Sequence, residues 1–148
     1  MDVRFKAWRT FLQAHALVIS TVERRLEAGL GLPFTWYDVL FQLAEAPGAR
    51  LRMHELAEAV LLSRSGLTRS VDRLEAAGLV SRQAIPGDRR STHVVLSDAG
   101  GERLAAAYPI VRRAILELFA AHLDDEDAET LVRILGRVRD RALAPHEK

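Results

Sequence analysis

The chain contains no cysteine among its 148 residues, and this absence excludes several kinds of chemistry. Disulfide bonds, thiolate nucleophiles, cysteine-ligated zinc and thiol redox sensing all require a residue that the sequence lacks. Long apolar runs are also missing, because no stretch approaches the roughly 18 residues that a membrane-spanning helix needs. We therefore expect no membrane partner and no disulfide framework.

The first residues of the chain are charged and lack the apolar segment of a secretory signal peptide. Hydrophobic residues make up 49% of the chain and charged residues 28%, a balance that excludes global disorder. A length of 148 residues is that of about one domain. We expect a single domain over residues 1–148, located in the cytoplasm.

Signatures of common enzyme and metal sites are missing too. The sequence has no nucleophile elbow, zinc-protease motif or phosphate-binding loop. His54 and Glu58 are four residues apart on a predicted helix, but two ligands do not make a metal site. The acidic run 124–127 is better explained by the favourable field at a helix N-terminus. We predict no cofactor, no metal and no enzymatic activity; a small-molecule enzyme is the least favoured alternative.

The net charge of +1 conceals an uneven distribution of charged residues. Residues 50–97 carry eight arginines and five acidic residues, whereas residues 98–148 carry eight basic and ten acidic residues. Arginine suits contacts with phosphates and base edges. The middle third of the chain is therefore the candidate nucleic-acid-binding region, although ordinary surface scatter would also produce such an excess.

Two terminal segments have apolar residues at intervals of three and four, which predicts long amphipathic helices over 4–28 and 124–142. A third long helix is predicted from Ser97-Asp98 to about His122, bent near Pro109. The apolar stripes are too long for one small core. We therefore predict that residues 1–30 and 98–148 form dimerisation helices, with packing inside one chain as the alternative.

The middle of the chain, residues 33–97, has the element order of a winged helix-turn-helix. Thr35 is predicted to cap one helix, and Ser63 is predicted to cap another that ends at the left-handed Gly78. In order, the predicted elements are a helix from Thr35 to Pro47-Gly48, an extended segment over 50–52, helices over 53–60 and 63–77, and strands over 79–84 and 92–97. The fold class is thus mainly α with a small β-hairpin wing, flanked by dimerisation helices.

The helix over 63–77 has an apolar arc and an opposite polar arc, as a DNA recognition helix requires. Arg89 and Arg90 lie at the predicted hairpin tip, where arginine suits the negative potential of a minor groove. Every amphipathic helix has a polar face, so the prediction of DNA binding rests on the order of the elements, in which a capped helix is followed by a wing. The candidate DNA-binding residues are Ser63, Arg64, Ser65, Thr68, Arg69, Arg73, Asp88, Arg89 and Arg90.

Three segments together resemble the winged-helix signature of MarR-type transcriptional regulators. They are Leu74-Glu75-Ala76-Ala77-Gly78-Leu79-Val80, Pro86-Gly87-Asp88-Arg89-Arg90 and Val94-Val95-Leu96-Ser97-Asp98-Ala99-Gly100. The resemblance implies an obligate homodimer that binds a pseudo-palindromic operator in double-stranded DNA. It also implies that Asp88 positions Arg90 for the minor groove. Ser97 replaces the more usual threonine, and Trp36-Tyr37 stand where glutamine is frequent.

Regulators of this type usually respond to a signal, so we expect a small aromatic effector in a cleft between the helices over 4–28, 35–46 and 98–122. The candidate ligand-binding residues are Trp8, His15, Trp36 and Tyr37. Aromatic residues at helical spacing also suit an ordinary core, and this alternative stays open. We predict a ligand-responsive repressor; the competing function is a winged-helix protein-interaction module that does not bind DNA.

Overall fold

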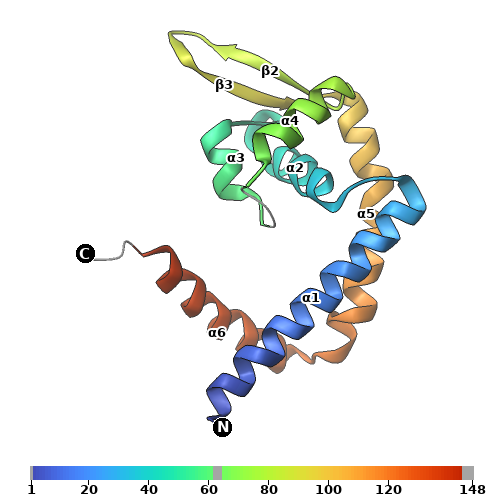
Figure 1. The fold of residues 1–148 in the computed structure, drawn as a ribbon, viewed down its shortest axis with the longest axis vertical. Coiled ribbons are helices and arrows are strands. Elements are labelled where there is room, and N and C mark those ends of the chain that lie inside the picture. The colour runs from blue at the N-terminus through green and yellow to red at the C-terminus, as the bar shows by residue number, and fades with distance from the viewer. Residues whose placement is uncertain (1, 62–64, 145–148) are drawn as a thin grey trace.

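The computed structural model describes residues 2–61 and 65–144 and has the predicted mainly helical architecture with a small sheet (Figure 1). The elements are α1 (Val3–Leu30), α2 (Phe34–Glu45), β1 (Arg50–Arg52), α3 (Met53–Ala59), α4 (Leu67–Ala76), β2 (Val80–Ile85), β3 (Asp88–Leu96), α5 (Asp98–Leu118) and α6 (Asp125–Leu143). Short 3-10 turns follow α2 and α5. The hairpin and α2–α4 lie at one end of α5, whereas the N-terminus and α6 lie at the other (Figure 1).

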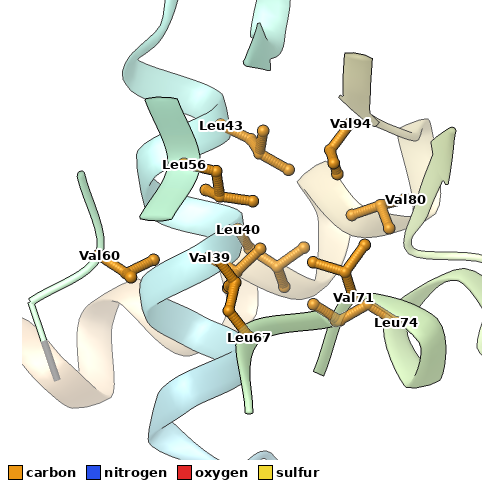
Figure 2. Close-up of a cluster of buried hydrophobic side chains, with 10 residues drawn as sticks. All are labelled: Val39, Leu40, Leu43, Leu56, Val60, Leu67, Val71, Leu74, Val80 and Val94. Atoms are coloured by element: carbon orange, nitrogen blue, oxygen red, sulfur yellow. The ribbon is translucent and has the colours of Figure 1, made fainter. Parts of the chain in front are cut away.

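The elements from α2 to β3, residues 34–96, form the winged unit. Its core is a cluster of ten buried side chains contributed by α2, α3, α4, β2, β3 and the residue that ends α3 (Figure 2). Leu40 and Leu43 of α2 are fully buried in its centre. Leu56 and Val60 point into it, as the spacing predicts. Burying a leucine or valine side chain stabilises the fold by about 1.5–3 kcal/mol, so this cluster fixes how α4 and the hairpin sit on α2.

A second cluster joins α1, α2 and α5. Ala107 and Ala114 of α5 are fully buried there beside Val22 and Leu26 of α1. Small side chains let the two long helices approach closely. Outside the cluster, an Arg25 Nη1 to Glu117 Oε2 ion pair of 2.8 Å also joins α1 to α5. The winged unit is thereby mounted on a pair of packed helices.

Two predicted helix starts are wrong. α2 begins at Phe34 with Pro33 as its N-cap and no side-chain capping bond, so Thr35 lies within the first turn. α4 begins at Leu67, later than predicted, and its N-cap is Gly66 in the left-handed conformation. A left-handed residue breaks the right-handed helix, which therefore starts only after Gly66. Ser63, the predicted cap residue, lies outside the described residues.

The predicted end of α4 and the predicted starts of α5 and α6 are confirmed. Gly78 has φ +76°, and the N–H groups of Leu79 and Gly78 donate to Leu74 O at 2.9 Å and Glu75 O at 3.0 Å. These are the two hydrogen bonds of a Schellman motif. Ser97 caps α5, and Asp124 begins α6 with a capping box. α5 ends at Leu118, earlier than predicted, and a 3-10 turn carries the chain on to His122.

The sheet has the strand order β1-β3-β2, and both pairings are antiparallel. The strand predicted over 92–97 instead begins at Asp88, because the hairpin turn needs only Pro86 and Gly87. Gly87 has φ +81°, as the third position of a type II turn requires. The candidate arginines Arg89 and Arg90 therefore belong to a strand rather than to a loop. In the described part of the chain, no helix combines the length and apolarity needed to cross a bilayer.

Candidate nucleic-acid interface

The recognition-helix candidate α4 has two clearly different faces. Leu67, Val71 and Leu74 are buried in the core of the winged unit. The opposite face is exposed and polar, and its residues are Thr68, Arg69, Asp72 and Arg73. Ser65 is exposed in the turn before the helix. Ser63 and Arg64, which were also predicted to contact DNA, lie outside the described residues.

The hairpin carries its two candidate arginines, Arg89 and Arg90, exposed to solvent beside the turn. Asp88 Oδ1 accepts the backbone N–H of Arg90 at 3.0 Å. This bond and a second one from Ser91 hold the pKa of the Asp88 carboxyl below its usual range. Asp88 thus constrains the backbone that carries Arg90. Arg52 of β1 lies 3.9 Å from Asp88 and brings a further positive charge to the hairpin.

The chain just after α3 is held by a buried carboxylate that sequence reasoning missed. Asp38 of α2 is only 6% exposed, and its Oδ2 accepts the backbone N–H of Leu61 at 2.7 Å. Its Oδ1 accepts a hydrogen bond of 3.4 Å from Gln42. Leu61 directly precedes the segment that leads to α4. The available signal was a carboxylate between two core residues, Tyr37 and Val39, in an otherwise apolar helix.

The four candidate effector residues fall into two separate groups. Trp8 and His15 lie on the N-terminal half of α1, where each ring contacts Phe11, at centroid distances of 6.1 and 6.3 Å. Tyr37 is buried in the second cluster, and Trp36 packs against both clusters. Burial, and to a smaller extent the charges of Tyr108 and Asp38, raise the pKa of Tyr37 to about 12, so the phenol is neutral at physiological pH.

Two concave surfaces lie near these groups. His15 and Phe11 line a groove of about 280 Å³ that Ile115 of α5 and Phe119, the residue after α5, complete. A larger concavity of about 570 Å³ lies between α2 and α5, lined by residues that include Glu45 and Tyr108. The larger one falls within the roughly 300–1,000 Å³ that small-molecule sites occupy. Within residues 2–61 and 65–144, no group of three or more histidine, aspartate or glutamate residues is placed to hold a metal ion.

A helix-turn-helix whose second helix carries an exposed basic face, followed directly by a two-stranded wing, defines the winged-helix class of proteins. Comparison with known proteins gives the family. A sequence model described as "MarR family" matches residues 30–91. The transcriptional regulator HosA of Escherichia coli O111:H- is 31% identical over 102 residues, which are 69% of this chain and 73% of HosA. The regulator PecS of Dickeya dadantii is 35% identical over 107 residues, which are 69% of this chain and 61% of PecS.

Solved structures agree with these relatives. Sco3205, a MarR family transcriptional regulator from Streptomyces coelicolor crystallised with DNA, superposes with a TM-score of 0.89 at 33% identity over 100% of this chain and 92% of its own. AbsC from the same organism superposes with a TM-score of 0.88 at 32% identity, over 96% of this chain and 95% of its own. The chain belongs to the MarR family of transcriptional regulators. These relatives are all transcriptional regulators.

Proposed function

We propose that the protein is a homodimeric repressor that binds a pseudo-palindromic operator in double-stranded DNA. The observation that carries this proposal is the placement of the exposed arginines of α4 and of the wing around one winged unit whose core fixes both. The DNA complex of Sco3205 supports it, because the two folds superpose over 100% of this chain and 92% of the Sco3205 chain. Such a regulator acts where its DNA is, so the proposed activity is cytoplasmic.

In this proposal, α4 enters the major groove with its exposed face toward the bases. Arg69 and Arg73 offer guanidinium groups that can bind guanine O6 and N7 as a fork, and Thr68 offers a hydroxyl. Ser63, Arg64 and Ser65, which precede the helix in the sequence, complete the proposed set. Because Leu67, Val71 and Leu74 anchor the other face in the core, the polar face keeps a fixed orientation.

The wing is proposed to contact the adjacent minor groove or its phosphates through Arg89 and Arg90. Narrow minor grooves attract arginine because their potential is more negative. The bond from Arg90 N–H to Asp88 supports this role, since it orders the backbone of the arginine before DNA is met. Asp88 acts here as a positioning group and does not itself approach the DNA.

The proposed dimer rests on apolar surface that one chain leaves uncovered. α6 has no buried residue, although its sequence has a clear apolar stripe. The N-terminal half of α1 and the last turns of α5 are exposed in the same way. The exposed large apolar side chains of these segments are Val3, Phe5, Trp8, Phe11, Leu12, Ile115, Leu116, Phe119, Val132, Ile134, Leu135, Val138 and Leu143. A patch of this extent indicates a protein interface, and we propose a second copy as its partner.

The proposed effector is a small aromatic molecule near Trp8, His15, Trp36 or Tyr37. The two tryptophans, Trp8 on α1 and Trp36 on α2, make this testable by fluorescence. In Trp8→Phe only Trp36 emits, and in Trp36→Phe only Trp8 emits. Titration of both variants with phenolic acids is expected to change one emission saturably and to weaken operator binding. No saturable change in either variant would remove these ligands from the proposal.

Fluorescence anisotropy with operator fragments recovered from genomic DNA tests the DNA-binding proposal. Affinity is expected to fall as salt rises, because arginine contacts release counterions from the phosphates. Arg90→Ala is expected to cost about 1–3 kcal/mol, as one good groove contact does. Arg24→Ala on α1 is the matched control and should leave affinity unchanged, since Arg24 is exposed and hydrogen-bonds Thr21 of its own helix. Salt-insensitive absence of binding would favour a protein-interaction module.

A further inference from the structure

Arg82 occupies an unusual position in the wing. It lies on β2, which is an edge strand of the sheet. Side chains alternate along a strand, so Arg82 shares the face of Val80, which is buried in the core of the winged unit. The side chain of Arg82 is only 23% exposed. Arginine is rarely placed on an inward face unless it is paired.

The partners of Arg82 are two carboxylates of α4, one turn apart. Its Nη2 lies 2.7 Å from Asp72 Oδ1, and its Nη1 lies 3.1 Å from Glu75 Oε1. The backbone N–H of Arg82 also donates to Glu75 Oε2 at 2.8 Å. One residue of the wing is thus tied to the recognition-helix candidate by three short polar contacts. The planar guanidinium makes such a double contact directional, which a lysine ammonium would not.

We propose that Arg82 is a positioning residue for DNA binding that holds the wing and α4 at the spacing needed for Arg69 and Arg90 to contact the same half-site. The covalent link between α4 and β2 is short, because the helix ends at Ala76 and the strand begins at Val80. This link fixes the start of β2 next to α4, whereas Arg82 holds the hairpin to α4 further along β2. This inference rests on the proposed DNA-binding function.

A purely electrostatic role for Arg82 predicts a different result. Asp72 and Glu75 are carboxylates on the same helix as Arg69 and Arg73, and their removal would strengthen attraction to phosphate. If Arg82 served only to neutralise them, the Asp72→Ala/Glu75→Ala double variant would bind DNA at least as tightly as the wild type. If Arg82 positions the wing, the double variant loses the same function as Arg82→Ala, because the arginine has lost both partners.

The test measures how the effect of Arg90→Ala depends on Arg82. In the wild-type chain, Arg90→Ala is expected to weaken operator binding by about 5- to 150-fold. In the Arg82→Ala and Asp72→Ala/Glu75→Ala backgrounds the wing is no longer held in place, so the same substitution is expected to cost less than in the wild-type chain. The decrease should exceed the factor of about two within which the effects of independent sites add. Hydroxyl-radical footprints of both backgrounds should lose protection where the wing lies, whereas protection of guanine N7 from methylation should keep the major-groove contacts of α4.

Two controls separate positioning from general loss of structure. Arg25→Ala removes a similar ion pair between elements, to Glu117 at 2.8 Å, but away from the wing, and should leave the cost of Arg90→Ala unchanged. Arg82→Lys keeps the charge without the fork and should restore only part of the coupling. If Arg82→Ala does not fold, Glu75→Gln, which keeps an acceptor for the backbone N–H, replaces it in the same cycle.

An equal cost of Arg90→Ala in all backgrounds would overturn the role of Arg82 and leave the proposed function intact. A wild-type chain that binds no DNA, or binds it without dependence on Arg90, would overturn both the assignment of the wing and the role of Arg82.

Discussion

Replacement of Gly100 tests how the winged unit is mounted on α5. Gly100 is buried in the first turn of the helix, and a Cβ added there would lie 2.1 Å from the carbonyl oxygen of Leu79 and 2.8 Å from Cδ1 of Leu96. The Leu79 carbonyl accepts the N–H of Ser97 at 3.1 Å, so moving it away disrupts the start of α5. Gly100→Ala must therefore displace backbone rather than the end of a flexible side chain.

The expected cost follows from two opposing effects. Overpacking of a tight site costs about 1–3 kcal/mol, and contact with backbone favours the upper part of that range. About 1 kcal/mol of this loss is offset because alanine has a higher helix propensity than glycine. We expect Gly100→Ala to lose about 2 kcal/mol of unfolding free energy and to weaken operator binding, since Leu79 connects α4 to β2.

Gly101 provides the matched control in the same helix. A Cβ added at Gly101 meets no atom within 4 Å, so Gly101→Ala should gain about 0.5–1 kcal/mol. Urea denaturation at one fixed protein concentration measures both variants, because the stability of an oligomer depends on concentration. The close approach of α5 to Leu79 would be refuted if both substitutions changed the unfolding free energy in the same direction, or if the Gly100→Ala variant were as stable as the wild type.

Three further predictions concern polar groups around the winged unit. Ser97→Ala should lower the unfolding free energy in urea by about 1–2 kcal/mol, because the hydroxyl caps α5 and donates to Gly78 O at 2.6 Å. Ser97→Thr keeps the hydroxyl and should change it very little; equal losses for the two variants would contradict the cap. Asp38→Ala should lower the unfolding free energy by about 1–3 kcal/mol, because it removes the charged acceptor of the Leu61 N–H, and Gln42→Ala should lower it much less; the reverse order would refute this role of Asp38. The pKa of Asp88 is lower in the folded chain than its ordinary value of 3.8. Its contribution to stability is therefore present above pH 3.8 and is lost as the pH falls through the folded pKa. A midpoint at or above 3.8 in an NMR titration of this carboxyl group would contradict the prediction.

The sequence predicted the fold where independent local signals coincided. The apolar arc of α4 and the glycine at its end both indicated one helix terminus, and the Schellman hydrogen bonds of Gly78 confirm it. The predicted starts of α2 and α4 are wrong because a residue type that can cap a helix does not by itself determine where the helix begins. Pro33 and the left-handed Gly66 occupy those N-cap positions, and neither uses a side-chain acceptor.

The candidate interface was predicted less completely than the fold. The exposed arginines could be named from helical periodicity and from the turn residues of the hairpin. Asp38 and Arg82 could not, because their roles depend on partners in other elements: Leu61 for Asp38, and Asp72 and Glu75 for Arg82. Periodicity describes which face a residue occupies, but it does not show which group lies opposite. The predicted effector residues illustrate the same limit, since Trp8 and Tyr37 lie in different parts of the molecule.

The most direct test of the central claim is a footprint of the purified full chain on genomic fragments that it selects. The proposed homodimer should protect a site with two-fold symmetry, in which two major-groove contacts lie about one helical turn, or 34–36 Å, apart. Protection should weaken as salt rises. Selection of no preferred sequence at low salt, or protection of a single site without symmetry, would contradict the account.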